Sequence, residues 1–309
     1  MSSVSVPASR RRTGLLRREA IDGYLFIAPW LIGFIIWIAG PMLFSLALVF
    51  LNWSLLSPPS FAGFSNFGTL FSDDLIPTTL YNTAYYTFIF VPLHVTLALL
   101  AALALNLRIR VVGVFRTIYY LPSITPTVAS AMLWLWIFNP DFGLVNLLLR
   151  KVHLPTSQWF VDPTWAKPAF IIMALWALGG AMIIFLAGLQ NIPQELYEAA
   201  SIDGADFWSR FWGVTLPMLS PVIFFNLVVG IIGSFQIFTT VFIISNGQGG
   251  PSNSTLFLVL YLYQNGFVFF KMGYASLIAW VLFLIVLIFT GIQFLAAKKW
   301  VHYEGLTSG

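Results

Sequence analysis

Long apolar segments and short polar ones alternate along the chain, and this alternation predicts its elements. Six apolar segments each approach or exceed the roughly 20 residues that an α-helix needs to cross a bilayer. Unpaired backbone groups are too costly in lipid, so these segments must be helical. We therefore expect an all-α membrane protein with six transmembrane helices, at Tyr24–Phe50, Tyr81–Leu105, Val114–Phe138, Ala169–Leu189, Leu219–Ser245 and Tyr274–Ala297.

The predicted helices form one transmembrane domain, residues 24–297, between two polar tails. Residues 1–23 are basic and are expected to be a disordered tail that leads to the membrane surface, and residues 298–309 form the second tail. Hydrophobic residues make up 59% of the 309 and charged residues 8%, with a mean hydropathy of +0.87. Soluble domains carry about 25% charged residues, so the composition also favours a membrane protein.

The distribution of basic residues predicts the orientation of the chain. If the N-terminus is cytoplasmic, eleven of the 15 lysines and arginines fall on cytoplasmic segments and four fall outside. Cytoplasmic loops carry this excess in membrane proteins, so both termini are expected in the cytoplasm. The formal charge of +4 is explained by this topology, and we expect no nucleic-acid partner. The absence of cysteine excludes disulfides and cysteine-ligated metals, and no metal site is expected.

A polar loop at residues 190–217 interrupts the apolar pattern. Good helix formers fill Glu195 to Ile202, and Asp203-Gly204 is expected to end that helix because glycine readily adopts the left-handed conformation. Asp206 is a suitable N-cap for a second short helix through Trp212. From these residues alone, the loop is either an amphipathic segment on the membrane surface or a compact knob that another protein binds.

The identity and spacing of the residues in this loop are more specific than the local structure that they predict. Glu198-Ala199-Ala200 is followed by three residues, then Gly204, nine residues, Val214, one residue and Leu216-Pro217. This resembles the EAA motif of binding-protein-dependent ABC importer permeases, with valine in place of isoleucine at one position. The resemblance implies that the loop is the coupling helix, which docks on a separate ATPase subunit. The implied coupling residues are Glu198, Ala199, Ala200, Asp203, Gly204, Leu216 and Pro217.

Other segments, in the same order, resemble the sugar-importer group of that family, of the maltose and glycerol-3-phosphate type. They are Tyr24–Gly33, Phe61–Phe71, Arg116–Pro122, Phe138–Pro140, Gly233–Phe238, Gly249–Pro251 and Gly273–Ser276. The resemblance implies a type I ABC importer permease fold in a bacterial plasma membrane. It also implies a second permease subunit, two ATPase subunits that hold ATP and Mg, an extracytoplasmic solute-binding protein, and a carbohydrate substrate. No cofactor is expected on this chain itself.

Uncharged polar groups on the fourth and fifth apolar segments are candidates for the substrate path. An amide such as that of Gln236 and an aromatic face such as that of Trp176 suit a sugar, which offers hydroxyl groups and an apolar ring face. Relatives of the maltose type bind sugar on these two segments. The positions that correspond or lie beside them, together with one nearby threonine, are Trp176, Leu178, Gly179, Gly230, Ser234, Gln236 and Thr239.

Two alternative functions stay open at this point. One is the same type of importer with glycerol-3-phosphate or another polar solute as substrate. The other is a polytopic membrane enzyme or an assembly factor. Enzymes and ion-driven carriers need ionisable groups at membrane depth, and His94 is the one such residue well inside a predicted span. We expect His94 to be a packing residue, and the chain to have no ATPase or other catalytic site of its own.

Overall fold

The computed structural model describes residues 10–107 and 111–302, and these fold almost entirely into helices. A short antiparallel hairpin, β1 (Leu51–Asn52) and β2 (Ser60–Phe61), pairs Leu51 with Phe61. The α-helices are α1 (Arg10–Phe34), α2 (Gly40–Leu48), α3 (Ser65–Ser72), α4 (Leu75–Leu105), α5 (Val112–Ile124), α6 (Thr127–Ile137), α7 (Leu144–Lys151), α8 (Pro163–Leu175), α9 (Gly179–Gln190), α10 (Gln194–Ile202), α11 (Phe207–Arg210), α12 (Leu216–Phe235), α13 (Thr239–Ile244), α14 (Leu258–Tyr263) and α15 (Met272–Trp300). Three π-helical segments, η1 (Ile35–Ala39), η3 (Phe211–Thr215) and η5 (Gln264–Val268), and two 3-10 turns, η2 (Trp159–Val161) and η4 (Pro251–Asn253), complete the set.

Four helical segments in the described residues are long and apolar enough to cross a membrane without a sharp bend. They are Arg17–Leu48, Leu75–Leu105, Phe207–Ile244 and Met272–Trp300. The pair α8 and α9 passes the same test together but bends by 47° at its break. The chain is thus a multi-pass helical protein, as the apolar pattern predicts.

The expectation of one continuous helix over Val114–Phe138 was wrong. The structure divides this segment into α5 and α6, with the break at Thr125-Pro126. Proline has no N–H and disfavours helical geometry in the residue before it. Thr125 accordingly has φ −70° and ψ 130°, which is extended backbone. The expected fourth and fifth spans are also interrupted, at residues 176–178 and 236–238.

Helix extends into both of the predicted tails. Helix α1 begins at Arg10, within the segment expected to be disordered, and α15 continues to Trp300. Residues 1–9 and 303–309, the outer parts of the two predicted tails, lie outside the described residues.

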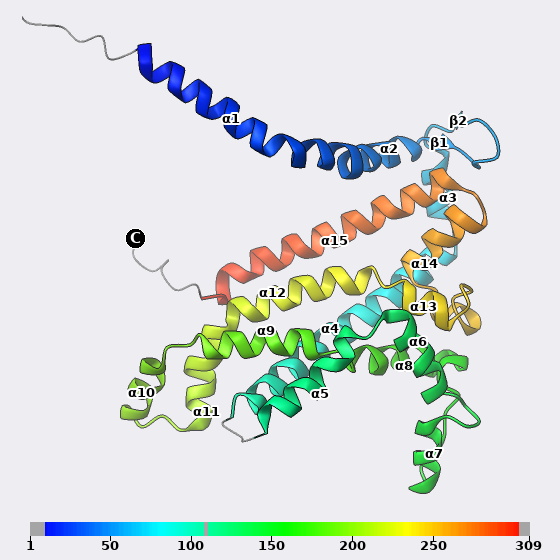
Figure 1. The fold of residues 1–309 in the computed structure, drawn as a ribbon. Helices are drawn as coiled ribbons and strands as arrows, with labels where there is room; N and C mark the ends of the chain where they lie inside the picture. The colour runs from blue at the N-terminus through cyan, green and yellow to red at the C-terminus, as the bar shows by residue number, and fades with distance from the viewer. Residues whose placement is uncertain (1–9, 108–110, 303–309) are drawn as a thin grey trace, which may run out of the picture.

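Helix α4 forms the centre of the bundle and packs against α9 and α12, while α15 packs on α12 (Figure 1). One core cluster lies between α4, α9 and α12 and includes Met182, Phe185 and Leu219. A second cluster lies among α4, α6, α8, α13 and α14 and includes Phe170 and Phe257. In a bilayer, helices associate through close packing and hydrogen bonds, because lipid is as apolar as the helix surface.

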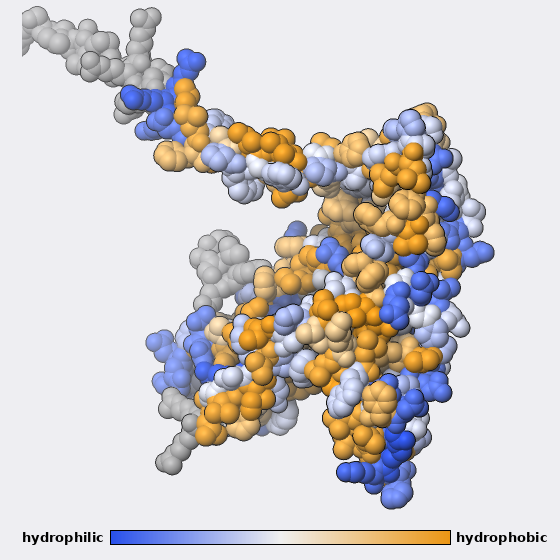
Figure 2. Space-filling view, turned by 45° about the vertical axis from the view of Figure 1, so that its right-hand side comes forward, coloured by the Kyte–Doolittle hydropathy of each residue, from blue (hydrophilic) through white to orange (hydrophobic). Residues whose placement is uncertain are grey.

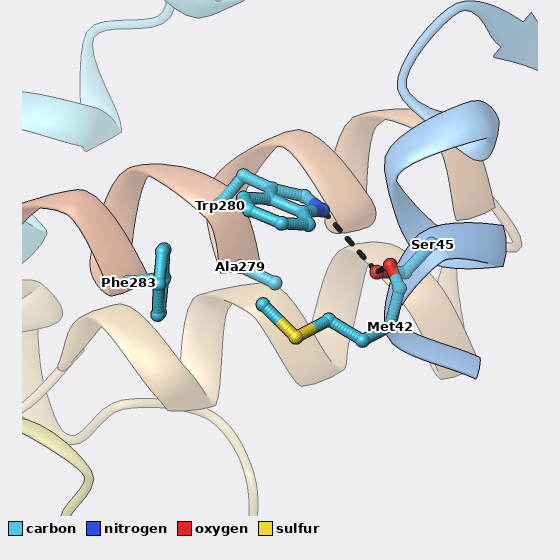
Figure 3. A pocket seen from close by; sticks show the side chains of 5 residues that line it. All are labelled: Met42, Ser45, Ala279, Trp280 and Phe283. Carbon is cyan, nitrogen blue, oxygen red and sulfur yellow. Dashed lines mark hydrogen bonds between the residues drawn. The ribbon is translucent and has the colours of Figure 1, made fainter. Parts of the chain in front are cut away.

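The N-terminal helical segment stands apart from this bundle, and a wide gap separates α1 from the rest in the space-filling view (Figure 2). Its connection to the bundle is made by α2, which packs on α15. There Trp280 Nε1 donates to Ser45 Oγ at 3.2 Å. A cavity of about 230 Å³, lined by Met42, Ser45, Ala279, Trp280 and Phe283, lies at this junction (Figure 3).

Hydrogen bonds join separate elements at the end of the bundle that holds α3 and α14. The Asp73 carboxylate accepts from the hydroxyls of Tyr261 on α14 and Tyr274 on α15, and from the Leu75 N–H at the start of α4. Burial acts to raise the pKa of Asp73. The hydrogen bonds and the nearby Lys271 outweigh burial, so this pKa lies below its usual value of 3.8. One carboxylate therefore joins α4, α14 and α15 at this end of the bundle.

Candidate functional site

The polar loop forms two short helices at the opposite end of the bundle (Figure 1). Helix α10 ends at Ile202, and Gly204 follows with φ +79°, a conformation that favours glycine. The Ala205 N–H donates to the Ala200 carbonyl at 2.9 Å, which closes the turn. Helix α11 then begins at Phe207. The expected stop at Asp203-Gly204 is therefore found, and we call α10, α11 and the turn between them the knob.

Asp206 caps the second helix as the sequence predicts. Its Oδ1 accepts from the Ser209 N–H at 2.8 Å. Hydrogen bonds from the Ser209 side chain and backbone hold the pKa of Asp206 below its usual value of 3.8. One expectation for this helix was wrong: it does not stop near Trp212. It runs through η3 directly into α12, so that Phe207–Ile244 forms one long apolar segment.

The exposed surface of the knob is both acidic and apolar. Glu195, Glu198, Asp203 and Asp206 are exposed carboxylates. Large apolar side chains are exposed beside them: Ile202 at 87%, and Phe207, Trp208 and Trp212 at more than half. Contiguous exposed apolar groups with a polar rim are typical of a protein-binding surface. These two chemistries together suit a partner groove that is basic and apolar.

The predicted coupling residues occupy different parts of this structure. Glu198 and Ala199 are exposed on α10, and Ala200 is half-buried. Asp203 and Gly204 form the exposed turn, whereas Leu216 and Pro217 are half-buried at the start of α12, beyond η3. Sequence reasoning missed the exposed aromatics, although four aromatic residues within Phe207–Trp212 could have indicated them.

The predicted substrate-path residues gather around two helix breaks. Trp176 and Leu178 lie in the break between α8 and α9, and Gln236 lies in the break between α12 and α13. Leu175 and Ile237, beside these breaks, pack on the same core cluster. Trp176 also meets Trp134 of α6 edge-to-face, with ring centroids 6.0 Å apart. Trp176, Gln236 and the nearby Thr239 are all exposed, so their side chains are available to a ligand or a partner.

The other residues predicted for the substrate path are engaged in helix packing. A Cβ on Gly179 would lie 2.2 Å from the Tyr119 carbonyl oxygen, so this glycine lets α9 approach α5. A Cβ on Gly230 would lie 3.1 Å from a Val91 methyl carbon on α4. The buried Ser234 hydroxyl donates to the Ile231 carbonyl of its own helix at 3.0 Å. Leu178 is half-buried and packs on the cluster between α4 and α9.

His94 lies on α4 and faces other protein groups. Its ring centroid is 5.1 Å from that of Phe90, and the ring lies beside the Ala177 backbone in the α8–α9 break. Among the residues that the structure describes, no three His, Cys, Asp or Glu side chains gather as metal ligands would. His94 therefore has the surroundings of a packing residue.

A family model described as "Binding-protein-dependent transport system inner membrane component" matches residues 94–301. The chain belongs to this family. The match covers the knob and both helix breaks, and it confirms the resemblance that the EAA spelling indicates. Family membership makes the chain a membrane component of a binding-protein-dependent transport system.

Two relatives extend the similarity over nearly the whole chain. The probable ABC transporter permease protein YesP of Bacillus subtilis (strain 168) is 42% identical over 297 residues, which cover 95% of this chain and 96% of YesP. The lactose transport system permease protein LacF of Rhizobium radiobacter is 37% identical over 298 residues, covering 94% of this chain and 99% of LacF. Both are named as permease proteins.

A solved structure shows the same fold. The crystal structure of a bacterial alginate ABC transporter, in complex with alginate pentasaccharide-bound periplasmic protein, contains a similar chain. The TM-score is 0.79 at 22% identity, and the match covers 92% of this chain and 96% of that one.

Proposed function

We propose that the chain is one of two permease subunits of an ATP-driven importer that carries a carbohydrate across a bacterial plasma membrane. A solute-binding protein outside the cytoplasm delivers the substrate, and two ATPase subunits hold ATP and Mg. The lactose permease LacF, at 37% identity over 94% of this chain, supports the carbohydrate class. The alginate transporter, whose fold this chain shares, was solved with a saccharide-bound periplasmic protein, which agrees with this class.

The proposed topology has six spans with both termini in the cytoplasm. In this proposal α5 with α6, and α8 with α9, each make one broken span, in addition to the four segments without a sharp bend. The described ends of the chain, at Arg10 and His302, lie at the knob end of the bundle (Figure 1). The excess of basic residues on segments at this end supports its assignment to the cytoplasm.

A second permease subunit explains the position of α1 and α2. Side chains such as Phe26, Trp30 and Trp37 are exposed along this segment, and the bundle covers almost none of it. Lipid can cover such a surface, and so can a helix of a neighbouring subunit. The broken helices give a second reason, because Trp176, Gln236 and Thr239 are exposed and need an opposing wall to form a closed path.

The observation that carries the proposal is the continuity between the knob and α12. The knob projects at one end of the bundle, and α11 runs without a break through η3 into α12, which ends at Phe235, next to Gln236. A displacement of the knob by ATPase subunits is therefore transmitted to a helix that borders the proposed path. Rigid-body movement of helices between two packed states then opens the path to alternate sides.

The breaks supply the polar groups for the solute. Backbone that leaves helical geometry at membrane depth must be buried in protein or line a polar cavity, and transporters place substrate sites at such breaks. The Gln236 amide can donate to and accept from sugar hydroxyls, and the Trp176 ring can stack on the apolar face of a sugar. Leu178, Gly179, Gly230 and Ser234 shape the surrounding walls, and Thr239 adds a hydroxyl.

The test is transport by the complete complex in proteoliposomes. The chain is purified with the subunits that bind it and is reconstituted with ATP inside and the solute-binding protein outside. Uptake of labelled di- and oligosaccharides that depends on ATP supports the proposal. Uptake of glycerol-3-phosphate alone would select the alternative solute, and uptake by this chain without ATPase subunits would refute the proposed mechanism.

The role of the knob is tested with Glu198→Arg in the same complex. Reversal of this exposed charge should weaken ATPase binding and reduce substrate-stimulated ATP hydrolysis by about tenfold or more, because like charges in an interface are strongly unfavourable. Asp141→Asn is the control, since Asp141 is an exposed carboxylate far from the knob, near α7. Equal stimulation in the Glu198 variant and the wild type would contradict the assignment.

A further inference from the structure

The connection between the knob and α12 has an unusual backbone. Segment η3 is π-helical, and the Leu216 N–H donates to the Phe211 carbonyl, five residues back. Pro217 follows, and it has no N–H to donate to the Gly213 carbonyl four residues back. A π-helical turn widens the helix locally and leaves its ladder of hydrogen bonds incomplete. The two parts of the long helix therefore meet at its least rigid point.

A chain of side-chain hydrogen bonds crosses this point. The hydroxyls of Tyr197 on α10 and Thr215 on η3 are 3.0 Å apart. The Thr215 hydroxyl also lies 3.4 Å from the Arg210 carbonyl oxygen, which accepts a hydrogen bond from it. Thr215 is only 6% exposed and Tyr197 is half-buried, so loss of this hydrogen bond costs stability.

A second hydrogen bond joins the two knob helices farther from the bundle. Arg210 Nη1 donates to Ser201 Oγ at 3.2 Å, and that hydroxyl donates to the Tyr197 carbonyl at 2.7 Å. Ser201 and Arg210 thus brace the knob internally. The Tyr197 and Thr215 hydroxyls join α10 to η3, and Thr215 also contacts the Arg210 carbonyl of α11. A cavity of about 430 Å³ adjoins this pair, lined among others by Leu103, Asn106 and Leu189 of neighbouring segments.

We infer that Tyr197 and Thr215 form the joint through which movement of α10 reaches α12. Helix α10 carries the exposed surface proposed to face the ATPase, and α12 leads to Gln236. The π-helical turn allows the two helices of the knob to change their angle to α12. The hydroxyl pair restricts that change, so that displacement of α10 moves α12 rather than being absorbed at η3. These two are positioning residues, and the inference rests on the proposed importer function.

The test uses Tyr197→Phe and Thr215→Val in the reconstituted complex, alone and together. Each substitution removes one hydroxyl and keeps the size of the side chain. The ratio of substrate-stimulated to basal ATP hydrolysis should fall by about two- to tenfold in each single variant, the effect of losing the bond between the two hydroxyls. Thr215→Val also removes the longer contact with the Arg210 carbonyl, so the double variant should lose no more stimulation than Thr215→Val alone. Basal hydrolysis and the amount of assembled complex should stay unchanged.

Two further variants separate coupling from simple stability. Thr215→Ser retains the hydroxyl and should restore stimulation. Thr117→Val is the matched control, because the exposed Thr117 hydroxyl donates only within α5, to Gly113 at 3.1 Å. The inference would be overturned if the losses of stimulation were additive in the double variant. It would also be overturned if assembly of the complex fell in parallel with stimulation. A wild-type complex without stimulation would instead refute the proposed function itself, so the two failures are distinct.

Discussion

At the scale of single residues, glycine positions decide where helices can touch. Gly179 begins α9, and an added Cβ would lie 2.2 Å from the Tyr119 carbonyl oxygen and 2.6 Å from the Tyr120 Cα. These are backbone atoms that cannot rotate away. The neighbouring Gly180 has no atom within 4 Å of such a Cβ. A methyl group added at Gly179 would clash with backbone atoms, whereas one added at the adjacent Gly180 would not.

Gly179→Ala should therefore destabilise the protein, whereas Gly180→Ala should be neutral or stabilise α9. Overpacking of this kind costs about 1–3 kcal/mol, while alanine in place of an unconstrained helical glycine gains up to about 1 kcal/mol. Thermal unfolding of both variants in detergent measures the difference. Equal midpoints for the two variants would mean that α9 does not approach α5 as closely as described.

At the scale of elements, side-chain hydrogen bonds hold the helix ends together. Asp73 connects α4, α14 and α15 through Leu75, Tyr261 and Tyr274. The pKa of Asp73 is lowered on folding, because hydrogen bonds and Lys271 outweigh burial. A group with a lowered pKa stabilises the fold above its unfolded value of about 3.8, and that stabilisation is lost as pH falls through the folded value.

Asp73→Asn should lower the unfolding temperature at neutral pH. The variant should also show a smaller decrease in unfolding temperature than the wild type on acidification below about pH 4. The amide keeps the shape of the carboxylate but loses its charge, and hydrogen bonds to a charged acceptor are the stronger ones. Asp74→Asn, at the adjacent exposed carboxylate, is the control. Unfolding temperatures measured from pH 3 to pH 7 provide the test. If both variants show the same profile as the wild type, Asp73 does not hold these helices.

At the scale of the whole molecule, the arrangement separates two ends with different chemistry. The knob lies at one end, with the described ends of α1 and α15, and α3 and α7 lie at the other (Figure 1). The proposed topology places the first end in the cytoplasm. The chain contains no cysteine, so single introduced cysteines can report the side of each loop without interference from native thiols of this chain.

A membrane-impermeant maleimide applied to intact cells should label Thr156→Cys and should leave Ile202→Cys unlabelled until the membrane is opened. Both positions are exposed, Thr156 in the loop after α7 and Ile202 at the tip of the knob. Labelling of the Ile202 variant from outside would reverse the topology and would place the knob beyond the reach of a cytoplasmic ATPase.

The sequence by itself determined the class of protein and the local structure of its polar loop. Apolar segments of bilayer length can be only helices in lipid, and local rules placed Gly204 in the turn and Asp206 at the cap, because these effects act within a few residues. The family followed from the spacing between Glu198 and Pro217. Pro126 was visible in the sequence too, but a long apolar run concealed the break that it causes.

Tertiary structure alone decided which residues meet. Asp73 and Tyr274 are 201 positions apart, and Tyr197 and Thr215 lie on separate helices whose angle is set by the turn at Gly204 and by η3. No local pattern distinguishes Gly179 from Gly180 or shows that α1 stands away from the bundle. In a membrane every helix can satisfy its apolar surface with lipid, so hydrophobicity selects no neighbours. Close backbone contacts and a few hydrogen bonds make that selection, and these depend on the fold as a whole.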